Sequence, residues 1–179
     1  MKTIALIGEP ATGKTTIARE VLRRLGPGVG FKSGLLRGTV HGNVHVFGIY
    51  GAGTFDGTDK LSMAVQPHAV EFINRIKSEA NAVVFFEGDR LGNIKFLSEC
   101  DRAGELSCFF LSATINNLVK RHNSRGDTQT PTFLSGRRTK VANIMDSFEG
   151  KAMTNDSEEE MRAVVDSIVS EIGSHNMAA

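Results

Sequence analysis

The feature that most constrains the fold is a glycine-rich octapeptide near the start of the chain, GEPATGKT at residues 8–15. It follows a short apolar run at residues 1–7 that has the length and composition of a buried strand. The pattern G-x-x-x-x-G-K-[ST] between a strand and a helix is typical of a loop that holds the phosphates of a nucleotide. We call residues 8–15 the phosphate-binding loop, and it predicts that the chain binds a nucleoside triphosphate.

Each residue type in this loop has a chemical reason. Gly8 and Gly13 are expected to adopt backbone angles that other residues resist, so that N–H groups turn toward phosphate oxygens. The helix that follows adds unpaired N–H groups and the positive end of its dipole. Lys14 is expected to reach the β- and γ-phosphates, and the Thr15 hydroxyl to ligate Mg²⁺. The predicted nucleotide contacts in this region are Gly8, Pro10, Ala11, Thr12, Gly13, Lys14, Thr15 and Thr16.

Size, charge and cysteine content narrow the class of protein. The 179 residues suit a single domain spanning 1–179, and no apolar run approaches the roughly 20 residues of a membrane span. Cys100 and Cys108 fit neither a disulfide framework nor a zinc site, so we expect reduced, buried thiols in a cytoplasmic protein. A net charge of +1 excludes a uniformly basic nucleic-acid coat, but it leaves room for a local basic face. The oligomeric state stays open.

Strand-like and helix-like segments alternate along the chain. Helices are expected at residues 14–25, 67–80, 93–102, 113–123, 137–148 and 157–172, the last ended by Gly173, and buried strands at 1–7, 82–86 and 106–111. Two runs rich in β-forming residues, 35–40 and 44–50, flank His41-Gly42-Asn43 and predict a β-hairpin. The alternation favours an α/β fold in which helices cover both faces of a parallel sheet.

Acidic residues close the second buried strand, in the sequence Glu87-Gly88-Asp89-Arg90. The carboxyl ends of parallel strands are where open α/β sheets bind ligands. Glu87 is therefore expected to hold Mg²⁺, or to act as a base, and Asp89 is a second candidate for the base. Arg90 is expected to contact the substrate.

Arginines flank a polar segment that we predict to be a mobile lid at about residues 124–136. Arg121 and Arg125 lie four residues apart on one helix face, and Arg137 follows the segment. The guanidinium group of arginine can donate two parallel hydrogen bonds, and it stabilises the negative charge of a phosphoryl group during its transfer. We predict catalytic roles for Arg121 and Arg125, nucleotide contact for Arg121 and substrate contact for Arg137. A solvated basic face is the alternative interpretation.

The glycine-rich loop at residues 51–60 carries residue types that suit a phosphate acceptor. Phe55 offers a ring for stacking, and Asp56 and Asp59 offer carboxylates that orient or deprotonate a hydroxyl. Lys60 belongs to the same loop. We predict substrate contact for these four residues and for Arg37, with Asp59 also catalytic. A plain connection is the alternative.

The phosphate-binding loop, the strand-end acids at 87–89, Arg121 with Arg125, and Asn155-Asp156 together resemble the P-loop kinases of the nucleotide-kinase group. The resemblance implies a parallel sheet of order 2-3-1-4-5, an arginine-bearing lid, and Asn155 near the adenine of the nucleotide. Two departures matter. A β-hairpin stands where adenylate kinases have a helical acceptor-binding region, and no D-R-x-x motif follows the second strand, so the identity of the acceptor does not transfer.

Three stretches, GTFDGTDKLSMAVQP at 53–67, FFEGDR at 85–90 and RGDTQTPTFLSGRRTK at 125–140, look like those of bacteriophage 5-hydroxymethyluracil DNA kinases. We therefore expect a kinase that uses ATP and Mg²⁺ to phosphorylate a hydroxyl of a nucleotide or of a base in DNA, in the host cytoplasm if phage-encoded. A free nucleoside or nucleotide kinase is one alternative. An ATP-binding switch or assembly ATPase without an acceptor is the other.

Overall fold

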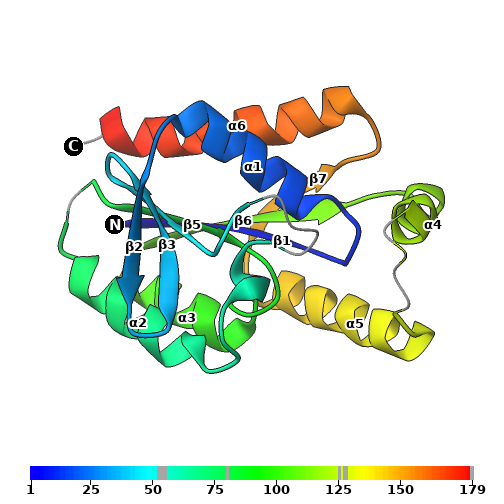
Figure 1. Cartoon of the computed structure of the whole chain (residues 1–179), viewed down its shortest axis with the longest axis horizontal. Helices are drawn as coiled ribbons and strands as arrows, with labels where there is room; N and C mark the ends of the chain where they lie inside the picture. Colours follow the sequence, from blue (N-terminus) through cyan, green and yellow to red (C-terminus); the bar gives the residue numbers. More distant parts are fainter. Residues whose placement is uncertain (52–55, 80, 125, 127–128, 178–179) are drawn as a thin grey trace.

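The computed structural model describes residues 1–51, 56–79, 81–124, 126 and 129–177. Its centre is a seven-stranded sheet of order β2-β3-β4-β5-β1-β6-β7, with helices on both faces (Figure 1). The strands are β1 (Lys2–Gly8), β2 (Val29–Ser33), β3 (Leu36–His41), β4 (Val44–Phe47), β5 (Val83–Glu87), β6 (Glu105–Ser112) and β7 (Gly150–Thr154).

The five strands from β4 to β7 in this order are parallel to one another. Counted along the chain they give the predicted order 2-3-1-4-5, which is confirmed. The predicted hairpin is present as β3 and β4, with Gly42 at a positive φ of 63° in its turn. The strand β2, which the sequence did not predict, pairs antiparallel with β3 and extends that edge of the sheet.

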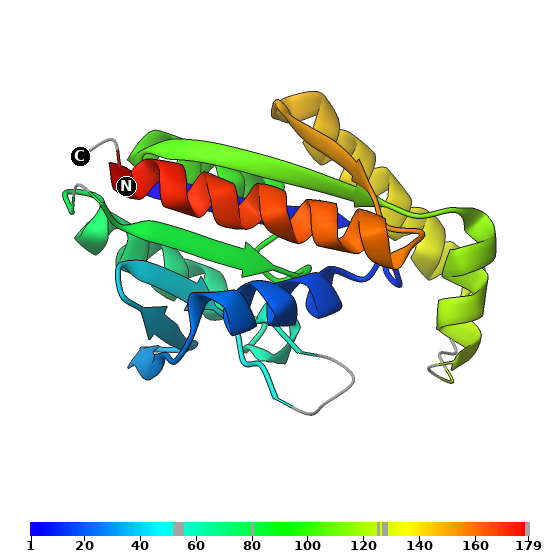
Figure 2. The ribbon, with the colours of Figure 1, turned by 90° about the horizontal axis from the view of Figure 1, so that it is seen from above.

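The helices lie in two layers (Figures 1 and 2). One layer contains α1 and α6, and the other contains α2, α3 and α5, whereas α4 projects beyond the end of the sheet. Their bounds are α1 (Lys14–Leu25), α2 (Val65–Ile76), α3 (Ile94–Ala103), α4 (Ile115–Ser124), α5 (Pro131–Ser147) and α6 (Glu158–Met177), with a short 3-10 helix η1 at Thr58–Lys60.

Alternation along the central strands divides the core between these layers. On β1, Ile4 and Leu6 pack in the cluster with α1 and α6, and Ala5 and Ile7 pack in the cluster on the other face. All four are buried, as expected for a parallel strand that is covered on both sides. The apolar run that predicted β1 therefore serves both halves of the core and fixes the position of the loop that follows it.

Several predicted boundaries differ from the observed ones. The helix α5 begins at Pro131, inside the segment predicted to be a loop, because Thr130 caps it and a proline is favourable at the first helical position. The strand β7 was not predicted. The helix α6 continues through Gly173, because glycine weakens a helix without forbidding it.

Cys100 and Cys108 are buried free thiols, as predicted. In the part of the chain that the structure describes, no helix is both long and apolar enough to cross a membrane.

Candidate functional site

The phosphate-binding loop joins β1 to α1 and has a constrained backbone. Positive φ angles occur at Ala11 (62°) and Gly13 (98°), and Gly13 also caps α1. A side chain at Gly13 would overlap the Asn155 amide. The prediction that Gly8 needs an unusual backbone angle was wrong, since its φ is not positive. What Gly8 needs is space, because a Cβ there would overlap the carbonyl oxygen of Leu111 on β6.

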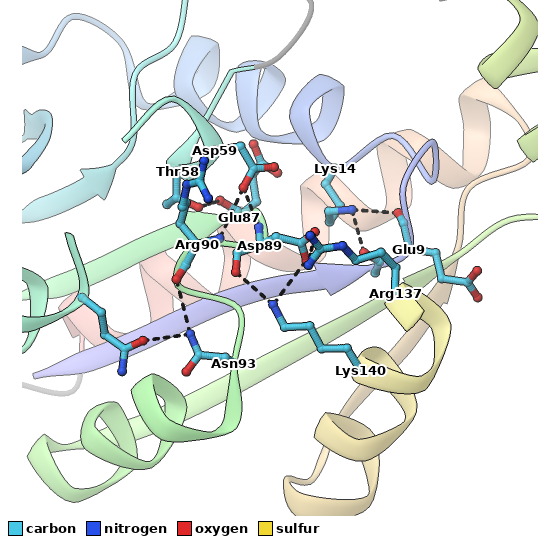
Figure 3. Close-up of polar contacts among 12 residues, drawn as sticks. Glu9, Lys14, Thr58, Asp59, Glu87, Asp89, Arg90, Asn93, Arg137 and Lys140 are labelled. Atoms are coloured by element: carbon cyan, nitrogen blue, oxygen red, sulfur yellow. Dashed lines mark hydrogen bonds and ion pairs between the residues drawn. The ribbon is translucent and has the colours of Figure 1, made fainter. Parts of the chain in front are cut away.

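Lys14 and Thr15 are the first two residues of α1, and Figure 3 shows the Lys14 side chain beside Glu9 in the phosphate-binding loop. Lys14 Nζ donates to the carbonyl oxygens of Gly8, at 2.7 Å, and Glu9, at 2.8 Å. Thr15 Oγ1 donates to Glu87 Oε1 at 3.2 Å. The loop therefore holds its lysine close to where phosphates are predicted to bind, and it sets the threonine hydroxyl beside a carboxylate.

Glu87 is 1% exposed at the last position of β5. Burial raises the pKa of its carboxyl to about 7, helped by the negative charges of Asp59 and Asp56 and opposed by Lys14 and by the hydrogen bond from Thr15. A bound cation would offset the cost of burying this charge. The pair Thr15 and Glu87 therefore fits Mg²⁺. In the described residues no cluster of three His, Cys, Asp or Glu side chains is placed to hold a metal, so phosphate oxygens and water would complete its coordination.

A cavity of about 200 Å³ opens beside this pair. It brings together most of the predicted site, from the phosphate-binding loop, the 51–60 loop, the end of β5 and α5. Its described lining residues are Pro10, Ala11, Gly13, Lys14, Thr15, Asp56, Asp59, Glu87, Asp89, Arg90, Gln129, Phe133 and Arg137. Asp89 and Arg90, just after β5, and Arg137 on α5 line the same cavity as Lys14, so the predicted donor and acceptor residues share one space.

The helix η1 docks on the end of β5 through two side chains. Asp59 Oδ1 accepts from the backbone N–H groups of Asp89, at 2.7 Å, and Arg90, at 3.3 Å. Thr58 Oγ1 donates to the carbonyl oxygen of Glu87 at 2.8 Å. These bonds fix the orientation of the Asp59 carboxylate at the cavity (Figure 3).

Asp89 connects β5 to α5. Its carboxylate lies 3.1 Å from Arg137 Nη1 and 3.5 Å from Lys140 Nζ, and its carbonyl oxygen accepts from Lys140 Nζ at 2.9 Å. The guanidinium of Arg137 also lies over the ring of Phe133, 4.6 Å from its centroid. Ion pairing with Asp89 thus places one face of α5 against the cavity.

Asp56 is held by the protein itself. It is 2% exposed, and its carboxylate pairs with Arg19, with Lys60 Nζ at 2.6 Å and with the Gly51 N–H at 2.9 Å. Burial alone would raise the pKa of Asp56, but the hydrogen bonds from Lys60, Gly51 and Arg19 lower it to about 2. Asp56 and Lys60, both predicted to contact substrate, are engaged with each other.

Arg121 and Asn155 lie on the other side of the phosphate-binding loop. The guanidinium of Arg121 donates to the carbonyl oxygens of Ala11 (3.2 Å), Thr12 (3.1 Å) and Asn155 (2.6 Å). The amide of the buried Asn155 donates to the Thr12 carbonyl oxygen at 2.7 Å. Arg121, Asn155 and Thr16 line a second pocket of about 410 Å³, which meets the cavity at Gly13. A position of Asn155 near the adenine of the nucleotide stays a prediction.

Among the residues predicted to contact substrate, Arg37 does not line the cavity in the described part of the chain. Arg37 lies exposed on β3 and lines a separate pocket with Lys32. Phe55 and Arg125 lie outside the described residues. Conversely, Phe133 lines the cavity and was not predicted. The signal that could have found it is the sequence Thr130-Pro131 that starts a helix two residues before it.

Comparison with known proteins identifies the family. The model of the family described as P-loop Nucleotide Kinase3 matches residues 1–176. Among solved structures, a gluconokinase from Sinorhizobium meliloti 1021 is 12% identical with a TM-score of 0.56, over 96% of this chain and 95% of that one. A shikimate kinase from Aquifex aeolicus vf5 is 14% identical with a TM-score of 0.50, over 99% of both chains.

At these identities the two structures show a shared fold. A search of the curated proteins found no significant match. The family match covers nearly all of the chain, including the phosphate-binding loop, the acids at the end of β5 and Asn155. The chain is a kinase that belongs to the P-loop nucleotide kinases, in the family P-loop Nucleotide Kinase3.

Proposed function

We propose that the protein transfers the γ-phosphate of ATP, with Mg²⁺, to a hydroxyl of a nucleotide or nucleobase. The observation that carries this proposal is the shared cavity, in which Lys14 and Thr15 face Asp59, Asp89 and Arg137. An ATPase switch needs no second set of charged side chains opposite its lysine. Catalysis in such a site consists mainly of positioning and of neutralising charge on the transferring group.

The side chains divide into donor and acceptor groups. Lys14 binds the β- and γ-phosphates, and Thr15 with Glu87 holds Mg²⁺, which would draw charge from the phosphate oxygens. Asp59 orients the acceptor hydroxyl and takes its proton. The alternative base, Asp89, is paired with two cations, whereas Asp59 has no ion-pair partner among the described residues. Arg90 and Arg137 provide positive charge beside the acceptor.

The best candidate for the acceptor is 5-hydroxymethyluracil in phage DNA, in a host cell's cytoplasm. Its support is the resemblance of residues 53–67, 85–90 and 125–140 to bacteriophage kinases that act on this base, together with the basic side chains of α5 beside the cavity. A base inside a duplex is out of reach of a phosphate in a cavity, so the enzyme would act on a flipped base or a single strand. Binding to DNA should then weaken with salt.

Transfer of radiolabel from [γ-³²P]ATP tests the proposal. The acceptors are single-stranded and duplex oligonucleotides with one 5-hydroxymethyluracil, the free 5-hydroxymethyldeoxyuridine monophosphate, gluconate and shikimate. We expect label in the oligonucleotide, almost none with Asp59→Asn, and normal labelling with Asp101→Asn, which changes an exposed carboxylate on α3.

Label in the free nucleotide alone would identify a nucleotide kinase, and label in gluconate or shikimate would overturn the nucleobase proposal. ATP hydrolysis that no acceptor changes would favour the switch.

A further inference from the structure

Phe133 is a large apolar side chain at a functional position. It lies in the first turn of α5, is 39% exposed and lines the cavity that contains Lys14 and Glu87. A single exposed phenylalanine on a protein surface needs no explanation. An aromatic ring in the wall of a cavity rich in charged side chains does need an explanation, because its apolar surface is left in contact with water. Among the described residues of that wall, Phe133 is the aromatic one.

The ring is held in place from two directions. The Phe133 N–H donates to Thr130 Oγ1 at 3.2 Å, which fixes the first turn of α5, and Pro131 restricts the backbone before it. The guanidinium of Arg137, one turn later, lies 4.6 Å from the ring centroid and is itself tied to Asp89 at 3.1 Å. A ring fixed in this way loses little further freedom when a ligand binds.

A fixed aromatic ring beside a guanidinium is the arrangement that binds planar heterocycles. Bases stack on phenylalanine rings and on arginine planes, and this stacking tolerates any base because each has a π face. A sugar acid or a cyclohexene carboxylate has no such planar face and would gain mainly from the charged groups. The wall therefore favours a ring over a non-planar acceptor.

We propose that Phe133, positioned by Arg137, is the surface on which the planar ring of the acceptor stacks, and that it makes the site prefer a planar base over a non-planar acceptor. This inference rests on the proposed function, since it places the acceptor base in the cavity. It goes further in assigning recognition of the ring to one side chain on α5.

The chain contains no tryptophan, so Phe133→Trp introduces a unique fluorophore at the proposed stacking surface. Stacking of a base should quench its emission. We expect quenching by the 5-hydroxymethyluracil oligonucleotide or by the free nucleotide without ATP, and none by gluconate or shikimate. The matched control is Met145→Trp, which places the fluorophore at an exposed position of the same helix. This binding signal does not depend on phosphate transfer.

Kinetics of two further variants test the role of the ring. Phe133→Leu keeps an apolar side chain and removes the π face, and it should raise the KM for the acceptor by roughly 5- to 150-fold, the range expected for one lost stacking contact. The KM for ATP should stay unchanged, and Phe133→Tyr should restore the KM for the acceptor. Comparing the oligonucleotide with the free nucleotide shows which source of the ring is preferred.

The outcomes separate this inference from the proposed function. Quenching by the base without label transfer would support the stacking surface and overturn the proposed reaction. Label transfer to the base with unchanged fluorescence and a wild-type KM in Phe133→Leu would overturn the stacking surface alone. Quenching by ATP and by no acceptor would also overturn it, because Phe133 would then face the donor nucleotide.

Discussion

Replacing Asp56 by asparagine should lower the free energy of unfolding by about 2 kcal/mol at neutral pH. The carboxylate is buried, and its bonds with Lys60, Gly51 and Arg19 outweigh the cost of burial, so its pKa falls from 3.8 to about 2. Each pKa unit corresponds to about 1.4 kcal/mol, which gives about 2 kcal/mol of preference for the ionised carboxylate in the folded state. Asparagine keeps the shape of the side chain and loses this preference.

The same reasoning fixes the pH dependence. Because the folded-state pKa lies below that of the unfolded chain, the stabilisation is complete above a pH of about 4 and is lost as the pH falls toward about 2. The difference in stability between wild type and Asp56→Asn should therefore shrink on acidification. Urea unfolding followed by circular dichroism, at neutral pH and at successively lower pH while the wild type stays folded, measures it.

Glu20→Gln is the control, since Glu20 also lies beside arginines on α1 but its carboxylate faces solvent, where screening weakens such pairs. We expect a much smaller loss of stability for this variant. A loss in Asp56→Asn that is equal at neutral and acidic pH would refute the reasoning, because it would not come from the charge. If Asp56→Asn had the stability of the wild type but a raised KM for the acceptor, Asp56 would instead contact the substrate, as the sequence predicted.

Three further predictions concern the phosphate-binding loop. Lys14→Ala should abolish label transfer and leave the melting temperature close to that of the wild type, because the backbone builds the loop; wild-type turnover at saturating ATP would contradict the assignment. Gly13→Ala should remove ATP binding measured by calorimetry, since its φ of 98° strains other residues by roughly 1–3 kcal/mol and its new methyl group would displace Asn155. Arg121→Lys should raise the Kd for ATP at least about tenfold, as it loses bonds to two loop carbonyls at about 1 kcal/mol each; an unchanged Kd would show that these bonds do not shape the nucleotide site.

The sequence predicted the buried strands and missed the strands at the two edges of the sheet. β1 and β5 are covered on both faces, so their side chains form continuous apolar runs that local reasoning detects. β2 and β7 lie at opposite edges, and most of their side chains are exposed. Such strands are held by backbone pairing with a neighbour and leave little apolar pattern. The start of α5 was missed for a similar reason, since Ile144 is its one buried residue.

The candidate site divides in the same way. The phosphate-binding loop is encoded by eight consecutive residues, so local spacing alone identifies its lysine and threonine. One partner of Asp56 is Arg19, which lies 37 positions away in the sequence, and no local spacing predicts that pair. Phe133 lines the cavity from α5, whose Arg137 pairs with Asp89 just after β5, far away in the sequence. Contacts that join distant segments decide which charged residues are available to a ligand.

The position of β1 in the middle of the sheet has a consequence for synthesis of the protein. In the described part of the chain β1 pairs with β5 and β6, so the backbone of Lys2 finds its partners only after Val83 and Glu105 have been synthesised. At roughly 5–20 residues per second, that wait is on the order of 5–20 s on a ribosome. The phosphate-binding loop is thus made early and assembled late, and ATP can stabilise the nascent chain only after β6 has emerged. Until then the apolar strand is exposed to chaperones and to aggregation.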